Sequence, residues 1–199
     1  MANYVVGITG ASGTIYARRL IEKLLERGHE VHVCMTRAAD LVAEAELGWD
    51  RAALEQDRQE ALRARFAGSQ RLFCYSIDAV GANIASGSFR MDGMVVLPCS
   101  MGTLSQIAHG ASQNLLERAA DVCLKERRRL VIVPREAPYN QIHLENMLTL
   151  NRCGAVIMPA SPGFYHGPGT IEELVDFFSA RVLDQLGVED NTVRRWQGM

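Results

Sequence analysis

The chain opens with MANYVVGITGASG (residues 1–13), in which an apolar run is followed at once by small and hydroxyl-bearing residues. Tyr4–Thr9 is typical of a buried β-strand, and Gly13–Arg27 has the apolar spacing of a helix. The glycines between them permit a tight turn, and the start of the following helix offers free N–H groups to an anion. The stretch therefore predicts a strand–turn–helix unit with a candidate cradle for phosphate or flavin. A turn that needs small residues only for packing is the alternative.

The same alternation of apolar runs and helical periods continues along the chain. Nearly uniform runs such as Met94–Leu97 indicate strands buried on both faces, as in a parallel sheet. We expect a single-domain α/β protein over residues 1–199, with a Rossmann-like (flavodoxin-like) three-layer α/β/α fold around a doubly wound, mostly parallel sheet. Further strands are expected at Glu30–Met35, Arg71–Tyr75, Gly93–Pro98, Leu130–Pro134 and Ala155–Pro159, and further helices at Arg37–Glu46, Asp50–Arg65, Asn114–Arg127, His143–Arg152 and Thr170–Leu186. The sequence assigns no function to residues 48–80.

Composition argues against several classes of partner. The formal net charge of -2 gives no bulk attraction to nucleic acid or to an anionic membrane surface. No apolar run approaches the roughly 20 residues that span a bilayer, and no signal-peptide pattern precedes the first strand, so we expect a cytoplasmic protein. The histidines lack a metal-ligand spacing, which predicts no metal site. Widely spaced cysteines without a C-x-x-C pair are interpreted as buried free thiols: Cys34, Cys74, Cys99, Cys123 and Cys153.

Polar residues follow the predicted strands at the edge where ligands bind in open α/β sheets. Thr36 follows the second strand, where its hydroxyl suits a mononucleotide or, equally, a helix N-cap. No acidic residue follows that strand and the G-x-G-x-x-G spacing is absent, so NAD is not expected. Pro98–Leu104 forms a second candidate cradle, although capping by Ser100 is a sufficient structural explanation. Arg135 and Glu136 follow the fifth strand, where the arginine suits phosphate or a flavin carbonyl.

Cationic side chains supply the other signal. Arg118 and Lys125 are seven residues apart and therefore share one face of their predicted helix. Tyr165 and Arg181 would add a phenol and a guanidinium to the same anion. Each also has an ordinary explanation, as a solvated helix end, a packed aromatic ring or a surface arginine. The residues alone predict a flavin-mononucleotide-like site with a cationic anion pocket.

Several motifs in this order resemble the UbiX flavin prenyltransferases. They are Gly7–Gly13, Ala85–Phe89, Pro98–Leu104, Arg118–Val122, Leu124–Arg128, Val133–Glu136, His143–Leu148, Phe164–His166 and Arg195-Trp196. The resemblance implies that FMN contacts Gly10, Ala11, Ser12, Thr36, Ser100, Met101, Gly102, Thr103 and Arg135. It implies that dimethylallyl phosphate is held by Tyr165, Arg181, Lys125 and Arg118, with Ser86 and Gly87 approaching from a neighbouring subunit of a homododecamer. Ser12, Glu46, Glu136 and Lys125 are the implied catalytic residues.

The resemblance also implies the reaction. A metal-independent enzyme of this family transfers a dimethylallyl group from dimethylallyl phosphate to N5 and C6 of reduced FMN, giving prenylated FMN for a UbiD-type decarboxylase. Two alternatives stay open: an FMN-dependent cysteine decarboxylase-like flavoprotein, and a non-catalytic FMN carrier that needs no allyl-phosphate pocket. The sequence leaves open which decarboxylase is served and whether the donor is the monophosphate or the pyrophosphate.

Overall fold

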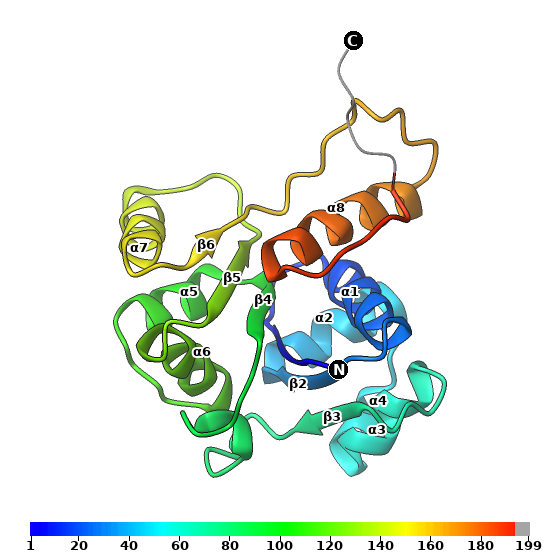
Figure 1. The fold of residues 1–199 in the computed structure, drawn as a ribbon, viewed down its shortest axis with the longest axis horizontal. Coiled ribbons are helices and arrows are strands. Elements are labelled where there is room, and N and C mark those ends of the chain that lie inside the picture. The colour runs from blue at the N-terminus through cyan, green and yellow to red at the C-terminus, as the bar shows by residue number, and fades with distance from the viewer. Residues whose placement is uncertain (194–199) are drawn as a thin grey trace.

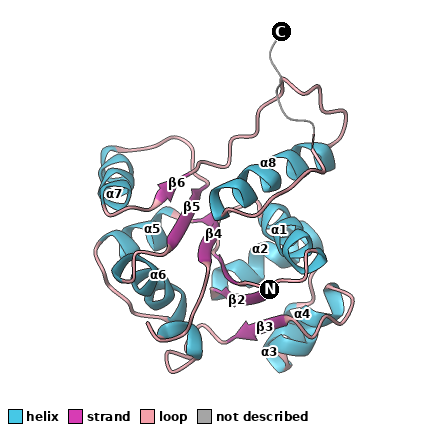
Figure 2. Ribbon diagram, viewed as in Figure 1, coloured by secondary structure: helices cyan, strands magenta, loops and turns pink. Residues whose placement is uncertain are grey.

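Six parallel strands form the central sheet of the computed structural model, which describes residues 1–193 (Figures 1 and 2). The predicted motif Arg195-Trp196 lies outside the described residues. The strand order is β3-β2-β1-β4-β5-β6, and every described pair is parallel. The strands are β1 (Asn3–Ile8), β2 (Glu30–Met35), β3 (Leu72–Tyr75), β4 (Gly93–Cys99), β5 (Arg129–Pro134) and β6 (Val156–Ile157). The predicted flavodoxin-like α/β fold is confirmed, because one parallel sheet carries helices on both faces.

Helices cover the sheet in two layers, each with its own apolar core. One layer packs α1 (Thr14–Glu26), α2 (Arg37–Leu47), α3 (Arg51–Gln56), α4 (Arg58–Arg65) and α8 (Ile171–Leu186) against one face. The other packs the short helix η1 (Asn83–Ala85), α5 (Met101–Ala108), α6 (Leu115–Lys125) and α7 (Gln141–Arg152) against the opposite face. From β1 the chain first crosses to β2, which pairs with one edge of β1, and β4 later pairs with the opposite edge of β1. The switch point of the topology, where such folds bind ligands, is therefore between β1 and β4.

The charged stretch predicted as one helix, Asp50–Arg65, is two helices. The break is at Asp57, whose carboxylate accepts the backbone N–H of Glu60 at 3.1 Å and so caps α4. The single-helix prediction is wrong because an aspartate at this position supports a new helix start. Leu54 of α3 and Leu62 of α4 are buried, so both short helices belong to the core of this face.

All five cysteines are free thiols. Burial raises the pKa of Cys34, Cys74 and Cys123 to about 12, which keeps these thiols protonated near neutral pH. The prediction that every thiol is buried is wrong for Cys153, which is exposed just after α7, and for the partly exposed Cys74.

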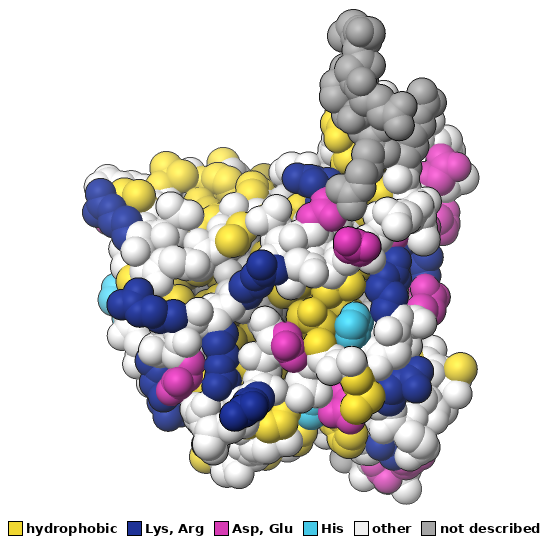
Figure 3. All heavy atoms as spheres, in the orientation of Figure 1, with side chains coloured by type: hydrophobic (Ala, Val, Ile, Leu, Met, Phe, Trp, Pro, Cys, Tyr) yellow, Lys and Arg dark blue, Asp and Glu magenta, His cyan; other side chains and the backbone are white. Residues whose placement is uncertain are grey.

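The surface carries mixed charge. Figure 3 shows basic and acidic side chains interspersed over one face, in keeping with the small net charge. Within residues 1–193, no helix is long and apolar enough to cross a membrane. Between β6 and α8, residues 158–170 form an arm that runs out from the body of the protein (Figure 1).

Candidate functional site

Thr9 joins the carboxyl ends of β1 and β4 at the switch point. Its hydroxyl donates to the Pro98 carbonyl at 2.8 Å and accepts the backbone N–H of Ser100 at 2.7 Å. Thr9 is fully buried, so these bonds form in a low-dielectric environment where each is strong. The bonds hold the turn after β1 beside the turn after β4. The sequence motifs predict no role for Thr9, although a hydroxyl at the end of a buried strand is a usable signal.

The turn after β1 requires glycine for a close approach. A Cβ placed on Gly10 would lie 2.5 Å from the Cβ of Ala38, in the first turn of α2. Gly13, just before α1, has a φ of 111°, which side chains rarely adopt. Ala11 is buried and Ser12 is exposed, so Ser12 faces outward from the turn. Gly10 thus allows the turn to lie against α2, and Gly13 supplies its left-handed residue.

The start of α1 already holds an anion of the protein itself. The carboxylate of Glu46 accepts the Gly13 N–H at 3.0 and 3.1 Å and the Thr14 N–H at 2.8 Å. Two of the N–H groups predicted to be free for an anion are therefore occupied by a carboxylate of the protein. A negative side chain at a helix N-terminus is stabilised by the helix dipole, and a phosphate would have to displace it. This turn fits the uncharged edge of a flavin ring better than a phosphate.

Two further helix starts face the same edge of the sheet. Thr36 caps α2 by accepting the Ala39 N–H at 3.2 Å, and Ser100 caps α5 by accepting the Thr103 N–H at 3.4 Å. Both capping interpretations are confirmed, and capping still leaves other N–H groups of each first turn without an intrahelical partner. At Gly102, an added Cβ would have no heavy atom within 4 Å, so the first turn of α5 borders open space. Met101 beside it is buried.

Arg135 and Glu136 extend this edge beyond β5. The Arg135 N–H donates to the Cys99 carbonyl at 3.1 Å, which continues the pairing of β4 with β5. The Arg135 side chain is exposed, whereas Glu136 is half-buried and accepts the Ala137 N–H at 3.1 Å. The turns after β1, β2, β4 and β5 thus bring glycines, hydroxyls and one guanidinium to the carboxyl edge of the sheet, where folds of this topology bind ligands in a crevice. These residues fit a flavin mononucleotide.

Four of the predicted phosphate-site residues gather around η1 and the end of α6. The Arg118 guanidinium donates to the Ala85 carbonyl at 3.3 Å and to Asp121 at 2.7 Å. Lys125 pairs with Glu126, and a Cβ on Gly87 would lie 2.7 Å from the Lys125 Nζ. The structure therefore brings Arg118, Lys125 and the Ser86–Gly87 segment together, with the Lys125 ammonium lying directly against the backbone of Gly87.

The other two lie at α8: Arg181 is exposed on that helix, and Tyr165 of the preceding arm packs on its buried Phe177. Phe177 and Arg181 are four residues apart and share a face of that helix. The Tyr165 ring packs edge-on against Phe177, with ring centroids 5.5 Å apart. Arg181 pairs with Asp184 at 2.6 Å. His166, which the sequence analysis set aside, stacks on Phe177 at 4.2 Å and completes this group.

Within one chain these two groups lie on opposite faces of the sheet. Buried residues of α6 belong to the core of one face, and buried residues of α8 belong to the core of the other. Lys125 ends α6 just before β5 begins, so it is at the amino edge of the strands. The seven residues of β4 span about 20 Å between that edge and the crevice. One chain therefore does not bring the four predicted phosphate ligands together.

Comparison with known proteins decides the family. The flavoprotein family model matches residues 1–183. A flavin prenyltransferase UbiX of Halalkalibacterium halodurans is 51% identical over 194 residues, covering 97% of this chain and 92% of that protein. The chain belongs to the UbiX flavin prenyltransferase family. The UbiX protein of Pseudomonas aeruginosa is 50% identical over 194 residues, covering 96% of this chain and 92% of that protein.

Solved structures agree with UbiX membership. A UbiX protein in complex with FMN and dimethylallyl pyrophosphate superposes with a TM-score of 0.90 at 38% identity, covering 100% of this chain and 98% of the other. A dodecameric FMN-dependent UbiX-like decarboxylase from Escherichia coli O157:H7 gives 0.88 at 43% identity, covering 98% and 100%. The cysteine decarboxylase SpaF gives 0.57 at 20% identity, covering 80% and 84% of the two chains. The cysteine-decarboxylase alternative thus has only the fold in its favour.

Proposed function

We propose that this chain transfers a dimethylallyl group from dimethylallyl phosphate to N5 and C6 of reduced FMN, as one flavoprotein domain over residues 1–199. The observation that carries the proposal is the set of four turns at the carboxyl edge of the sheet around the switch point, whose residues fit a flavin mononucleotide. The product, prenylated FMN, would serve a UbiD-type decarboxylase, and we place the enzyme in the cytoplasm. Membership of the UbiX family supports each of these assignments.

The crevice residues would hold the flavin. Reduced FMN supplies the electron-rich nitrogen and carbon that accept the prenyl group. Gly10, Ala11 and Ser12 would contact the ring, because Glu46 already satisfies the N–H groups where a phosphate would otherwise bind. The open first turn at Gly102, with Ser100, Met101 and Thr103, would contact another edge of the ring. Thr36 suits the phosphate of FMN, and Arg135 suits a ring carbonyl or that phosphate.

The cationic residues would stabilise the leaving phosphate. An allylic phosphate ionises readily when preorganised donors stabilise the charge that develops on it, and this requires no metal. Arg118, Lys125, Tyr165 and Arg181 supply two guanidiniums, an ammonium and a phenol. Since the two groups lie on opposite faces of one chain, a complete pocket would combine side chains from neighbouring copies. The dodecameric relative from E. coli supports a homododecamer here.

Three side chains could move or retain protons at the crevice. Ser12 faces outward from the flavin turn, and Glu136 is half-buried beyond β5. Both would exchange a proton with the bound ligand. Glu46 would act differently, because its two oxygens already accept backbone N–H groups at the start of α1. We propose that Glu46 chiefly fixes the flavin turn.

Anaerobic turnover tests the proposed function. Purified protein would be mixed with FMN, a reductant and either dimethylallyl phosphate or dimethylallyl pyrophosphate, and the flavin mass would be measured. A flavin heavier by one C5 prenyl unit that activates an apo-decarboxylase supports the transferase, and comparison of the two donors identifies the substrate. Tightly bound but unchanged FMN with both donors would favour the FMN carrier instead.

A further inference from the structure

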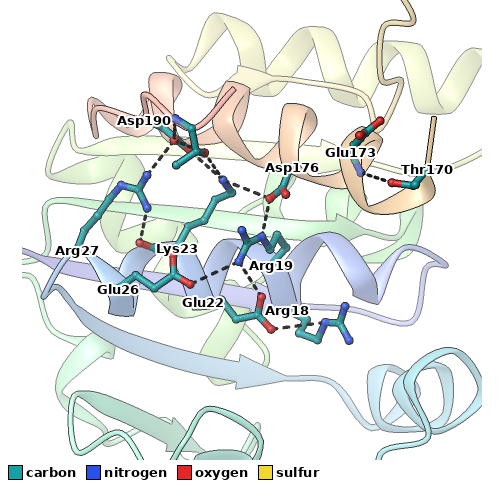
Figure 4. A network of polar contacts seen from close by, with 11 residues as sticks. Arg18, Arg19, Glu22, Lys23, Glu26, Arg27, Thr170, Glu173, Asp176 and Asp190 are labelled. Atoms are coloured by element: carbon teal, nitrogen blue, oxygen red, sulfur yellow. Dashed lines mark hydrogen bonds and ion pairs between the residues drawn. The ribbon is translucent and has the colours of Figure 1, made fainter. Parts of the chain in front are cut away.

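Lys23 is a fully buried cation that the proposed chemistry does not use. It lies in the second half of α1, is 0% exposed, and is one of the chain's two lysines. Its ammonium donates to Asp190 at 3.0 Å and to the Thr192 hydroxyl at 2.8 Å, and lies 3.3 Å from Asp176 of α8 (Figure 4). Asp190 is also 0% exposed. A buried charge is costly unless it is fully paired, and the Lys23 ammonium has an oxygen partner for each of its three donors.

Arg19 of α1 and Arg27, which directly follows α1, extend the contact on either side of Lys23. Arg19 donates to Asp176 at 2.5 Å. Arg27 pairs with Asp190 at 2.9 Å and donates to the Glu189 carbonyl at 3.1 Å. Arg19, Lys23 and Arg27 are four residues apart and form one cationic stripe along α1. This stripe holds both α8 and the segment that follows it (Figure 4).

The cationic stripe contacts α8 through Asp176, next to the helix face that carries Arg181. Asp176 directly precedes Phe177, so the two side chains are about 100° apart around the helix axis. Asp176 faces α1, whereas Arg181 is exposed and the buried Phe177 packs against the ring of Tyr165. A rotation or shift of α8 at Asp176 would therefore move Arg181 and Tyr165 together. The segment held through Asp190 directly follows the other end of the same helix.

We propose that Lys23 is a positioning residue for the phosphate pocket. It fixes the rotation of α8 about its axis and the position of α8 along that axis, so that Arg181 and Tyr165 form a preformed site for the prenyl phosphate. The inference rests on the proposed function, since it assigns these two side chains to the phosphate. An ammonium suits the position because its three donors can point to three separate oxygens, whereas the planar guanidinium donates in a flat fork. Asp190 stays ionised near neutral pH, because the hydrogen bonds from Thr192 and Lys23 outweigh the desolvation of its carboxylate and lower its pKa to about 2.

The test compares Lys23→Met with Arg63→Met as a matched control. Arg63 is 17% exposed in α4 and donates to the Leu72 carbonyl at 3.1 Å, away from α8. Each protein would be loaded with oxidised FMN, which cannot accept the prenyl group, and titrated with dimethylallyl phosphate in a calorimeter. We expect Lys23→Met to weaken dimethylallyl phosphate binding at least about tenfold with FMN affinity unchanged, because preorganisation is lost without loss of a ligand contact. Arg63→Met should bind both ligands as the wild type does.

Stability is measured in parallel, since Lys23→Met leaves the buried Asp190 and the partly exposed Asp176 short of a partner. The double variant Lys23→Met/Asp190→Asn removes one of those charges and should recover part of the thermal stability without recovering phosphate binding. A lower melting temperature with wild-type phosphate binding would overturn the inference, because the network would then serve stability alone. If the wild-type protein transfers the prenyl group and Lys23→Met binds dimethylallyl phosphate with wild-type affinity, the inference is refuted. The proposed function then stays intact. A wild-type protein that neither binds nor transfers the prenyl group would overturn both.

Discussion

Glu46, at the end of α2, caps the helix that begins at Thr14, with a carboxylate oxygen 2.8 Å from the Thr14 backbone nitrogen. The same carboxylate binds the Gly13 N–H, so it sets the shape of the turn that we assign to the flavin ring. A residue 33 positions away along the chain therefore fixes the flavin turn.

Glu46→Ala should loosen this turn. Loss of the charged cap should lower the free energy of unfolding by about 1–2 kcal/mol. FMN affinity should fall as well, because the turn would no longer be held in its binding shape. Urea unfolding and fluorescence titration with FMN measure the two effects. Unchanged stability together with lost turnover would instead make Glu46 a proton-transfer group alone.

Gly10→Ala should disturb the approach of the flavin turn to α2. The new Cβ would lie 2.5 Å from that of Ala38, and such overpacking costs about 1–3 kcal/mol of stability. Gly102→Ala is the matched variant, because its Cβ meets no heavy atom of the protein within 4 Å. It should therefore fold as the wild type does and lose only FMN affinity. Equal unfolding free energies for the two variants would contradict this account of Gly10.

Lys125→Ala and Arg181→Ala should impair prenyl transfer without impairing FMN binding. Removal of one preorganised donor to developing charge lowers kcat by about 10²–10³ in comparable sites. Arg127→Ala is the control, because this exposed arginine lies beside Lys125 and has no assigned role. Steady-state kinetics with dimethylallyl phosphate distinguishes the cases. Full activity in both test variants would favour an FMN carrier, which needs no phosphate pocket.

His32 makes stability depend on pH. Burial lowers its pKa from 6.5 to about 4, and its ring stacks on Phe73 and contacts the Tyr75 hydroxyl at 2.9 Å. Between those two pKa values the unfolded chain binds a proton that the folded chain does not, so stability falls as pH decreases from about 6.5 to 4. The expected loss is about 3 kcal/mol. Urea unfolding at several pH values should show a shallower slope for His32→Phe, and equal slopes would refute this assignment.

The sheet could be predicted from the sequence to within one or two residues for most strands, because strands buried on both faces are almost uniformly apolar. The site could be predicted only in part. Thr36 and Ser100 stand at helix starts that local sequence predicts, whereas the partner of the Gly13 N–H is set by tertiary packing. The positions of Arg118 and Arg181 on opposite faces of the sheet depend on which side each crossover takes, and motif order does not encode this. The buried site of Lys23 was equally hidden, because its partners lie more than 150 residues away along the chain.

Reconstitution from two inactive variants tests most directly that the prenyl-transfer site is shared between copies. Arg135→Ala damages the flavin crevice, and Lys125→Ala damages the cation group at the opposite edge of the sheet. Co-expression of equal amounts should restore about one quarter of wild-type activity, since random assembly gives that share of sites an intact crevice and an intact neighbouring lysine. Mixed assemblies that stay as inactive as either parent would contradict the account, because each site would then be built from a single chain.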